Sequence, residues 1–374
     1  MLSTEKLGFL ETIALITIVI TNKIILNTAK DIISSTGSSA WINVIYISIV
    51  AIIITLLISK LFKHFQGKDI LDICSYLGGN PLKLIMGILY ISSLLLVPVS
   101  VIKNFSDTLQ LIYYKTSPLP YIVCFFILGS LIANRYPLKT IAKTNLLIIP
   151  IVFVSILIIL FSSINSFKIE RIYPILGDGF NETFFSGLSN LFSFSGIGYL
   201  LFINPFLNNT KDFKKISIIS VTISGIYLFL SVICILLSLT YSYYSEEPFS
   251  LYLLTRNLNY GKFIQRIDAI FIFIWILATL SYISIAFNFC IYIFKRLTNI
   301  QDTICINYTF HLLIFAILII PTSFATFSNI VISISKYGSL ILIFGISIFI
   351  LFLANLKKKI FAKQKGKLNE SIIS

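Results

Sequence analysis

Long apolar runs separated by short polar segments recur along the whole chain. A hydrocarbon layer about 30 Å thick is crossed by about 20 residues of α-helix, and runs close to that length or longer recur from end to end. The pattern predicts ten membrane-spanning helices, at residues 9–28, 41–62, 82–112, 119–134, 142–164, 183–206, 214–241, 267–294, 306–326 and 337–356.

The composition supports the same class of protein. Of 374 residues, 57% are hydrophobic and 12% are charged, whereas a soluble domain has about 25% charged residues. We therefore expect an all-α integral membrane protein, with residues 1–374 forming a single polytopic domain. A net charge of +14 would suggest nucleic-acid binding in a soluble protein. Here the basic residues lie between apolar runs, so they are explained by membrane orientation, and no nucleic-acid partner is expected.

The distribution of Lys and Arg predicts how the chain is oriented. With the N-terminus in the cytoplasm, the inside segments hold more than twice as many Lys and Arg as the outside segments. Cytoplasmic segments of membrane proteins carry such an excess. We therefore expect both termini in the cytoplasm, with a basic tail at residues 357–374. This tail could meet anionic membrane lipid, although a topological anchor is the simpler role.

Ten spans divide into two sets of five, and an odd number per set makes the second set enter the membrane with opposite polarity. This is the arithmetic of a 5+5 inverted repeat, here about 9–164 and 183–356. In such repeats the first helix of each half is often broken at a central binding site. Spans 1 and 6 are therefore where ligand-binding residues are expected.

Span 6 contains the sequence Ser195-Gly196-Ile197-Gly198, which we assign to the site. Two glycines weaken a helix, and a flanking serine can satisfy freed backbone groups. Close helix packing through small residues is the alternative.

Span 1 contains Thr21-Asn22-Lys23 in its outer half, and these residues are also assigned to the site. A lysine at membrane depth costs several kcal/mol unless it is paired or solvated. Snorkelling of Lys23 to the outer surface is the competing interpretation.

Two further spans place polar groups at membrane depth. In span 3, Lys103 and Asn104 are candidates for ligand contact, although Lys103 and Asp107 are spaced to form a structural ion pair. In span 8, Ser284 belongs to a polar stripe that could line the cavity or bond to a neighbouring helix.

No catalytic motif is present, so an enzyme is not expected. The two histidines have no partner cluster, and the five cysteines show no CxxC spacing. Neither a metal site nor a cofactor is predicted.

The segment from Pro248 to Trp275, PFSLYLLTRNLNYGKFIQRIDAIFIFIW, carries a family resemblance. It resembles the spore germination receptor B subunits (GerAB-like), within the amino acid–polyamine–organocation superfamily. The matching residues are Pro248, Arg256, Gly261, Phe263, Arg266 and Asp268, whereas Lys262 stands where an acidic residue is expected. Weaker matches are Ala40-Trp41 and the segment PILGDG at 174–179.

This resemblance implies a LeuT-type fold with a site between spans 1, 3, 6 and 8. It implies a sensor of a small germinant such as an amino acid, located in the spore inner membrane with both termini on the spore core side. It also implies receptor A and C subunits as partners. Span 1 departs from the family pattern, because Thr21-Asn22-Lys23 stands where Gly near the break is common, and this leaves the ligand open. The alternative function is an amino-acid or polyamine secondary transporter, since fold alone does not separate the two.

Overall fold

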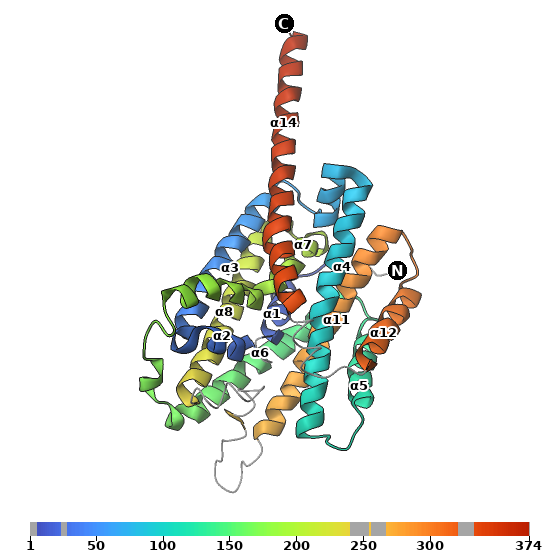
Figure 1. Cartoon of the computed structure of the whole chain (residues 1–374). Helices are drawn as coiled ribbons and strands as arrows, with labels where there is room; N and C mark the ends of the chain where they lie inside the picture. Colours follow the sequence, from blue (N-terminus) through green and yellow to red (C-terminus); the bar gives the residue numbers. More distant parts are fainter. Residues whose placement is uncertain (1–5, 24–27, 240–253, 256–266, 321–332, 374) are drawn as a thin grey trace.

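The computed structural model describes residues 6–23, 28–239, 254–255, 267–320 and 333–373 (Figure 1). Within these ranges every regular element is a helix, and one isolated β-bridge joins Leu7 to Leu207. Residues 248–253 and 256–266, which carry most of the family resemblance, lie outside the described residues.

The described α-helices are α1 (Phe9–Lys23), α2 (Ala29–Thr36), α3 (Ala40–Phe62), α4 (Ile70–Ile112), α5 (Leu119–Ala133), α6 (Leu138–Ser163), α7 (Leu200–Ile203), α8 (Phe213–Ser238), α11 (Ile267–Thr298), α12 (Thr303–Ile319) and α14 (Ser347–Ile373). The 3₁₀ segments are η2 (Gly37–Ser39), η3 (Ile164–Ser166), η4 (Ile169–Ile172), η6 (Ser186–Tyr199), η7 (Asn204–Phe206) and η8 (Thr210–Asp212). Two π-helical segments are η5 (Asn181–Phe185) and η9 (Leu340–Ile346).

Seven helical stretches in the described part of the chain are long and apolar enough to cross a membrane. They are 29–62, 70–112, 138–166, 181–206, 210–238, 268–298 and 333–360. The remaining three predicted spans coincide with the shorter helices α1, α5 and α12. The integral membrane class follows from these helices, while the count of ten spans stays a prediction.

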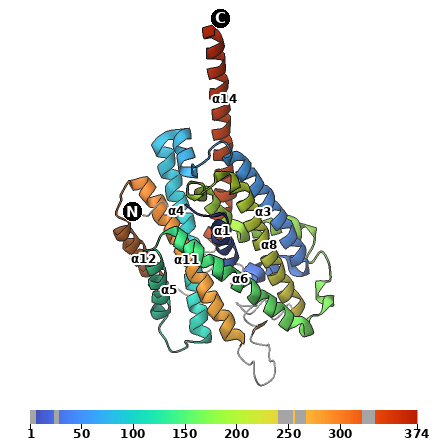
Figure 2. The ribbon, with the colours of Figure 1, turned by 180° about the vertical axis from the view of Figure 1, so that it is seen from behind.

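The helix α1 lies at the centre of the bundle in both views (Figures 1 and 2). Every residue from Thr12 to Lys23 is buried, and α1 packs against α6, α8, α11 and η6. The outer helices instead expose apolar side chains, such as Ile49 and Ile53 of α3 and Phe125 of α5. Apolar residues on the outside fit a protein whose surroundings are lipid rather than water.

The helix α4 begins with a capping box in which Asp69 accepts a hydrogen bond from the Asp72 backbone N–H at 2.9 Å. Its helical geometry is interrupted at Gly78 and Gly79, and Gly79 has a φ of 70°. Only glycine adopts such an angle readily. This kink separates the first two turns of α4 from the portion predicted to span the membrane from residue 82.

Candidate functional site

The structure describes the first predicted span, at residues 9–28, as the single helix α1 up to Lys23. The helix α1 ends at Lys23 and α2 begins at Ala29, and residues 24–27 between them lie outside the described part. The Lys23 side chain is in the last turn of α1, and this residue is only 7% exposed. Carbonyl groups at a helix C-terminus favour a cation, so the place of Lys23 at the end of α1 favours the charged form of its side chain.

The sixth span does not open into a gap but tightens into a 3₁₀ helix over the fourteen residues of η6. Such runs rarely exceed three or four residues, and in the middle of a span they mark a hinge or a strained sequence. The sequence predicts a weakened helix in span 6, and the structure shows that weakening as a 3₁₀ helix. The segment η6 contains all four residues assigned to the site from span 6, Ser195, Gly196, Ile197 and Gly198.

Lys23 is held by groups of η6. Its Nζ atom donates a hydrogen bond to the Phe192 carbonyl at 3.2 Å and another to the Ser195 hydroxyl. It also lies 4.6 Å from the centroid of the Phe192 ring, within the range of a cation–π contact. Among the described residues, no carboxylate forms an ion pair with Lys23. The amine is therefore surrounded by neutral dipoles instead of a counter-charge.

Gly196 allows η6 to approach α1 closely. A Cβ atom at this position would lie 3.1 Å from the Ile20 Cα and backbone N atoms, and 2.7 Å from its Cγ1. Gly198 faces a different neighbour, because a Cβ atom there would lie 2.8 Å from the Ile343 Cδ1 atom. Gly198 therefore packs closely against η9, and its assignment to the ligand site stays a prediction.

A small cavity of about 10 Å³ lies at the junction of α1 and η6. This volume is close to the minimum that holds one water molecule. Its lining residues are Val19, Lys23, Ser93, Leu94, Val97, Ser195, Gly196, Tyr199, Tyr282, Ser339 and Ile343. Three predicted site residues, Lys23, Ser195 and Gly196, therefore meet around one cavity.

The other residues predicted from spans 1, 6 and 8 are not among the lining residues. The Thr21 and Ser284 hydroxyls each donate to a carbonyl of their own helix, at 2.8 and 2.6 Å respectively. Asn22 accepts a hydrogen bond from Thr279 at 3.2 Å, which ties α1 to α11. Ile197 is fully buried among apolar residues.

The residues predicted from span 3 form a separate cluster on α4. The Lys103 Nζ and Asp107 Oδ1 atoms are 3.1 Å apart in a buried ion pair. The neighbouring Asn104 has a buried Oδ1 atom without a hydrogen-bond partner among the described residues. Neither Lys103 nor Asn104 lines the cavity.

Several lining residues had no assignment from the sequence. Tyr199 directly follows Gly198, and Tyr282 lies beside the polar stripe of span 8, so their positions gave a usable signal. Ser93 and Ser339 are joined by a hydrogen bond of 3.1 Å between α4 and the helix that starts at residue 333. Serines are frequent throughout this chain, so nothing in the sequence singled these two out.

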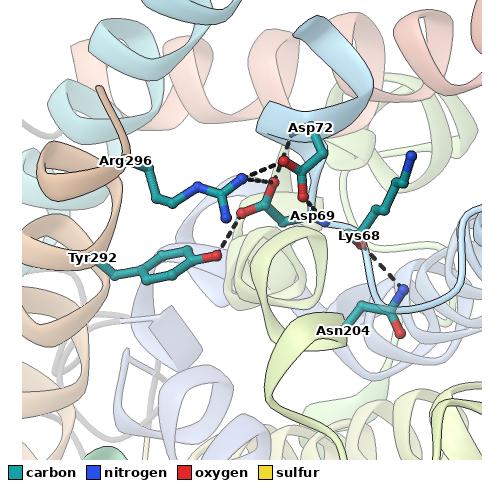
Figure 3. A network of polar contacts seen from close by, with 6 residues as sticks. All are labelled: Lys68, Asp69, Asp72, Asn204, Tyr292 and Arg296. Atoms are coloured by element: carbon teal, nitrogen blue, oxygen red, sulfur yellow. Dashed lines mark hydrogen bonds and ion pairs between the residues drawn. The ribbon is translucent and has the colours of Figure 1, made fainter. Parts of the chain in front are cut away.

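A polar network around Asp69 lies at one end of the bundle (Figure 3). The Tyr292 hydroxyl donates to Asp69 Oδ2 at 2.7 Å, and Arg296 forms an ion pair with Asp72. The Asn204 amide donates to the Phe65 and Lys68 carbonyls, both at 3.1 Å. Burial and the Asp72 carboxylate raise the pKa of Asp69, against the opposing effect of Arg296. The network connects the start of α4, the end of α11 and the end of the sixth span.

The start of the described chain is attached to the same end. The Leu7 N–H donates to the Phe206 carbonyl at 2.7 Å, and the Asn208 N–H donates to the Leu7 carbonyl at 3.1 Å. Lys6 donates to the Pro205 carbonyl at 2.6 Å. The segment that leads into α1 is therefore fixed to the segment that follows η6, so the two central elements are coupled at this end.

Comparisons with known proteins identify what this chain resembles. The family model described as "Spore germination protein" matches residues 6–327. Spore germination protein B2 of Bacillus subtilis (strain 168) is 20% identical over 277 residues, which cover 73% of this chain and 74% of that protein. Spore germination protein KB of the same organism is 21% identical over 245 residues, covering 64% and 65%.

Solved structures show the same fold. A manganese transporter from Eremococcus coleocola, in complex with an aromatic bis-isothiourea substituted compound, superposes with a TM-score of 0.58 at 14% identity. The match covers 92% of this chain and 76% of the transporter. These neighbours are LeuT-fold transporters, so the LeuT-type fold is confirmed, while the number of spans and the inverted repeat stay predictions.

Proposed function

Because the chain belongs to the family of spore germination proteins, we propose that it is a germinant-sensing subunit of a spore germination receptor. It binds a small ligand such as an amino acid in mid-membrane, between spans 1, 3, 6 and 8. The observation that carries this proposal is the buried Lys23 at the cavity between α1 and η6, without a carboxylate partner among the described residues.

The chemistry of the cavity favours a ligand that carries a carboxylate. The Lys23 ammonium group supplies a charge-assisted hydrogen bond, which is about twice as strong as a neutral one. The Ser195, Tyr199 and Tyr282 hydroxyls can orient the rest of a polar ligand. A fixed ammonium group repels polyamines and divalent cations, so neither is the preferred ligand of this site. The described residues of the cavity lining include no Asp, Glu, His or Cys that could bind a metal ion.

Binding requires the two central elements to separate. A cavity of about 10 Å³ does not hold an amino acid. The ligand therefore selects an arrangement in which η6 and α1 lie further apart, and the change in population is the signal. We propose that receptor A and C subunits detect this change, in the spore inner membrane, with both termini on the spore core side.

The test is the dose–response of germination in a strain that carries Lys23→Met. Loss of a charge-assisted hydrogen bond of about 1.5–3 kcal/mol shifts the response to an amino-acid germinant at least about tenfold. Lys143→Met, on an exposed lysine outside the cavity, serves as the matched control. Protein levels in the spore membrane are compared by immunoblot. An unchanged dose–response with Lys23→Met at normal protein level rules out the proposed role of Lys23.

A second candidate function is secondary transport of an amino acid, favoured by the fold shared with a transporter. Uptake of radiolabelled amino acids into proteoliposomes containing only this chain distinguishes the two. Accumulation without any other subunit supports transport. Saturable binding without uptake supports the sensor.

A further inference from the structure

A second and larger cavity lies at the end of the bundle that carries Asn204, and it shares no lining residue with the central site. Its volume is about 490 Å³, which is within the 300–1,000 Å³ typical of small-molecule sites. The end of α3, the segment that follows it and the start of α8 form its walls. The lining residues are Leu56, Ser59, Lys60, Phe62, Lys63, Gln66, Asn204, Thr210, Lys211, Phe213 and Lys214.

Four lysines give this cavity its charge. Lys60 and Lys63 are three residues apart at the end of α3, and Lys211 and Lys214 have the same spacing where α8 begins. All four are exposed, and no ion pair between them and a described carboxylate is present. In the part of the chain that the structure describes, no acidic side chain lines the cavity. Four like charges around one cavity repel one another, so the arrangement is stabilised by an anion.

The position of the cavity relates it to the membrane surface. Lys60 lies at the last turn of the span 29–62, and Lys214 lies in the first turn of α8 within the span 210–238. The lysines are therefore at the level where the hydrocarbon layer ends. Lysine side chains at this depth reach the headgroups while their apolar stems stay against the helix.

An apolar stripe leads from the cavity along α3. Ile45, Ile49, Ile53 and Leu57 follow one another at intervals of four residues and are each 42–57% exposed. Lys60 continues this face, being three residues beyond Leu57. Twelve residues of helix at about 1.5 Å each give roughly 18 Å, close to the depth of one leaflet at about 15 Å. The stripe thus offers a surface for an acyl chain directly below the charges.

We propose that this cavity binds the phosphate-containing headgroup of an anionic phospholipid, with an acyl chain against the stripe on α3. Basic pockets between membrane helices bind anionic headgroups by this combination of charge and location. The lysine pairs at the end of α3 and at the start of α8 approach the phosphate from two sides. A bound lipid therefore links the second and seventh predicted spans. The assignment is independent of the ligand at the central site.

The experiment uses the purified full chain in a neutral detergent. Its thermal unfolding midpoint is measured with phosphatidylglycerol, phosphatidylcholine or inorganic phosphate, and retained lipid is counted by native mass spectrometry. Phosphatidylglycerol should raise the midpoint by a few degrees and remain bound, because a ligand of the folded state stabilises it. The variant Lys60→Gln/Lys63→Gln/Lys211→Gln/Lys214→Gln should lose both effects.

A control variant removes the same charge elsewhere at the predicted cytoplasmic side. It combines Lys68→Gln, Lys139→Gln, Lys143→Gln and Lys215→Gln, none of which lines the cavity. It should keep the response to phosphatidylglycerol. Equal loss in this control, or equal stabilisation by phosphatidylcholine, overturns the proposal.

Two other results would also overturn it. Equal protection by inorganic phosphate would assign the cavity to free anions. Absence of any lipid effect, with receptor assembly lost only in the cavity variant, would assign it to an acidic segment of a partner protein.

Discussion

Gly196 is the residue at which the two central elements come closest. A Cβ atom in place of one of the Gly196 Cα hydrogens would lie 3.1 Å from the Ile20 backbone. Neither a backbone atom nor the centre of a buried helix can move aside at low cost. Overpacking of this kind costs about 1–3 kcal/mol.

We therefore expect Gly196→Ala to lower the unfolding midpoint of the purified chain and to weaken the response to ligand. Gly338→Ala is the matched control, because a Cβ there meets nothing within 4 Å. Alanine favours a helix over glycine, so the control should leave the midpoint unchanged or raise it. Equal destabilisation by both substitutions would show that the contact with Ile20 is unimportant. Thermal unfolding in detergent measures the comparison.

Lys23 illustrates which residues of the candidate site could be predicted from the sequence. A lysine inside an apolar run is costly, so the sequence alone marks it as a candidate. Ser195 and Gly196 were predicted because the repeat argument directs attention to span 6. Tyr199 and Tyr282 lie next to residues that drew attention in spans 6 and 8, but they were missed because that position alone does not select two of the chain's 19 tyrosines.

The polar cluster on α4 offers a direct test of whether buried charges serve the structure or the ligand site. Its Lys103–Asp107 pair is buried, with side chains 6% and 11% exposed. Removing one partner of such a pair leaves an uncompensated charge and costs about 3–5 kcal/mol. Replacing both partners by apolar residues of similar size is often nearly neutral.

Asp107→Asn should therefore destabilise the chain strongly, whereas Lys103→Met/Asp107→Leu should restore most of its unfolding midpoint. Because neither residue lines the cavity, the double variant should also keep the wild-type dose–response to germinant. A stable double variant with an altered dose–response would instead place this pair in the ligand path. The measurements are thermal unfolding of purified protein and germination of the corresponding spores.

The sequence pattern does not predict the polar network around Asp69 or the 3₁₀ geometry of η6. The Asp69, Asp72 and Arg296 side chains lie at the ends of spans, where charged residues are ordinarily solvated. Their association depends on the packing of α4 against α11, which the pattern of apolar residues does not specify. The 3₁₀ geometry of η6 is equally hidden, because two glycines predict a weak helix without specifying how it deforms.

At the scale of the whole molecule, the first and last spans meet the same end of the bundle. Leu7 pairs with Leu207, and Asn204 donates to the Phe65 carbonyl. Close to it, Lys358 of α14 donates to the His64 carbonyl. An even number of membrane crossings brings both ends of a chain to the same side. The arrangement therefore agrees with an even span count, while the direction of insertion rests on the excess of Lys and Arg.

The exposed Cys305 is a native probe of that direction. It lies in the first turn of α12, only a short connection after α11, whose Arg296 is bound to Asp72 in the polar network around Asp69. Cys305 should therefore share the predicted cytoplasmic side with both termini. A membrane-impermeant maleimide should label it in inverted vesicles and not in intact cells that express the chain. Cys74, Cys234 and Cys290 are buried and should stay unlabelled in the folded protein.

The control places a thiol at the other end of the bundle. Lys115→Cys, combined with Cys305→Ser, introduces a cysteine in the exposed segment between α4 and α5. The maleimide should label this variant in intact cells. Treating the cells first with a second impermeant thiol reagent should block that labelling. The opposite pattern in both proteins would invert the topology and place the four-lysine cavity in the outer leaflet. In that case the basic segments would have to be held outside against the bias that normally retains them in the cytoplasm.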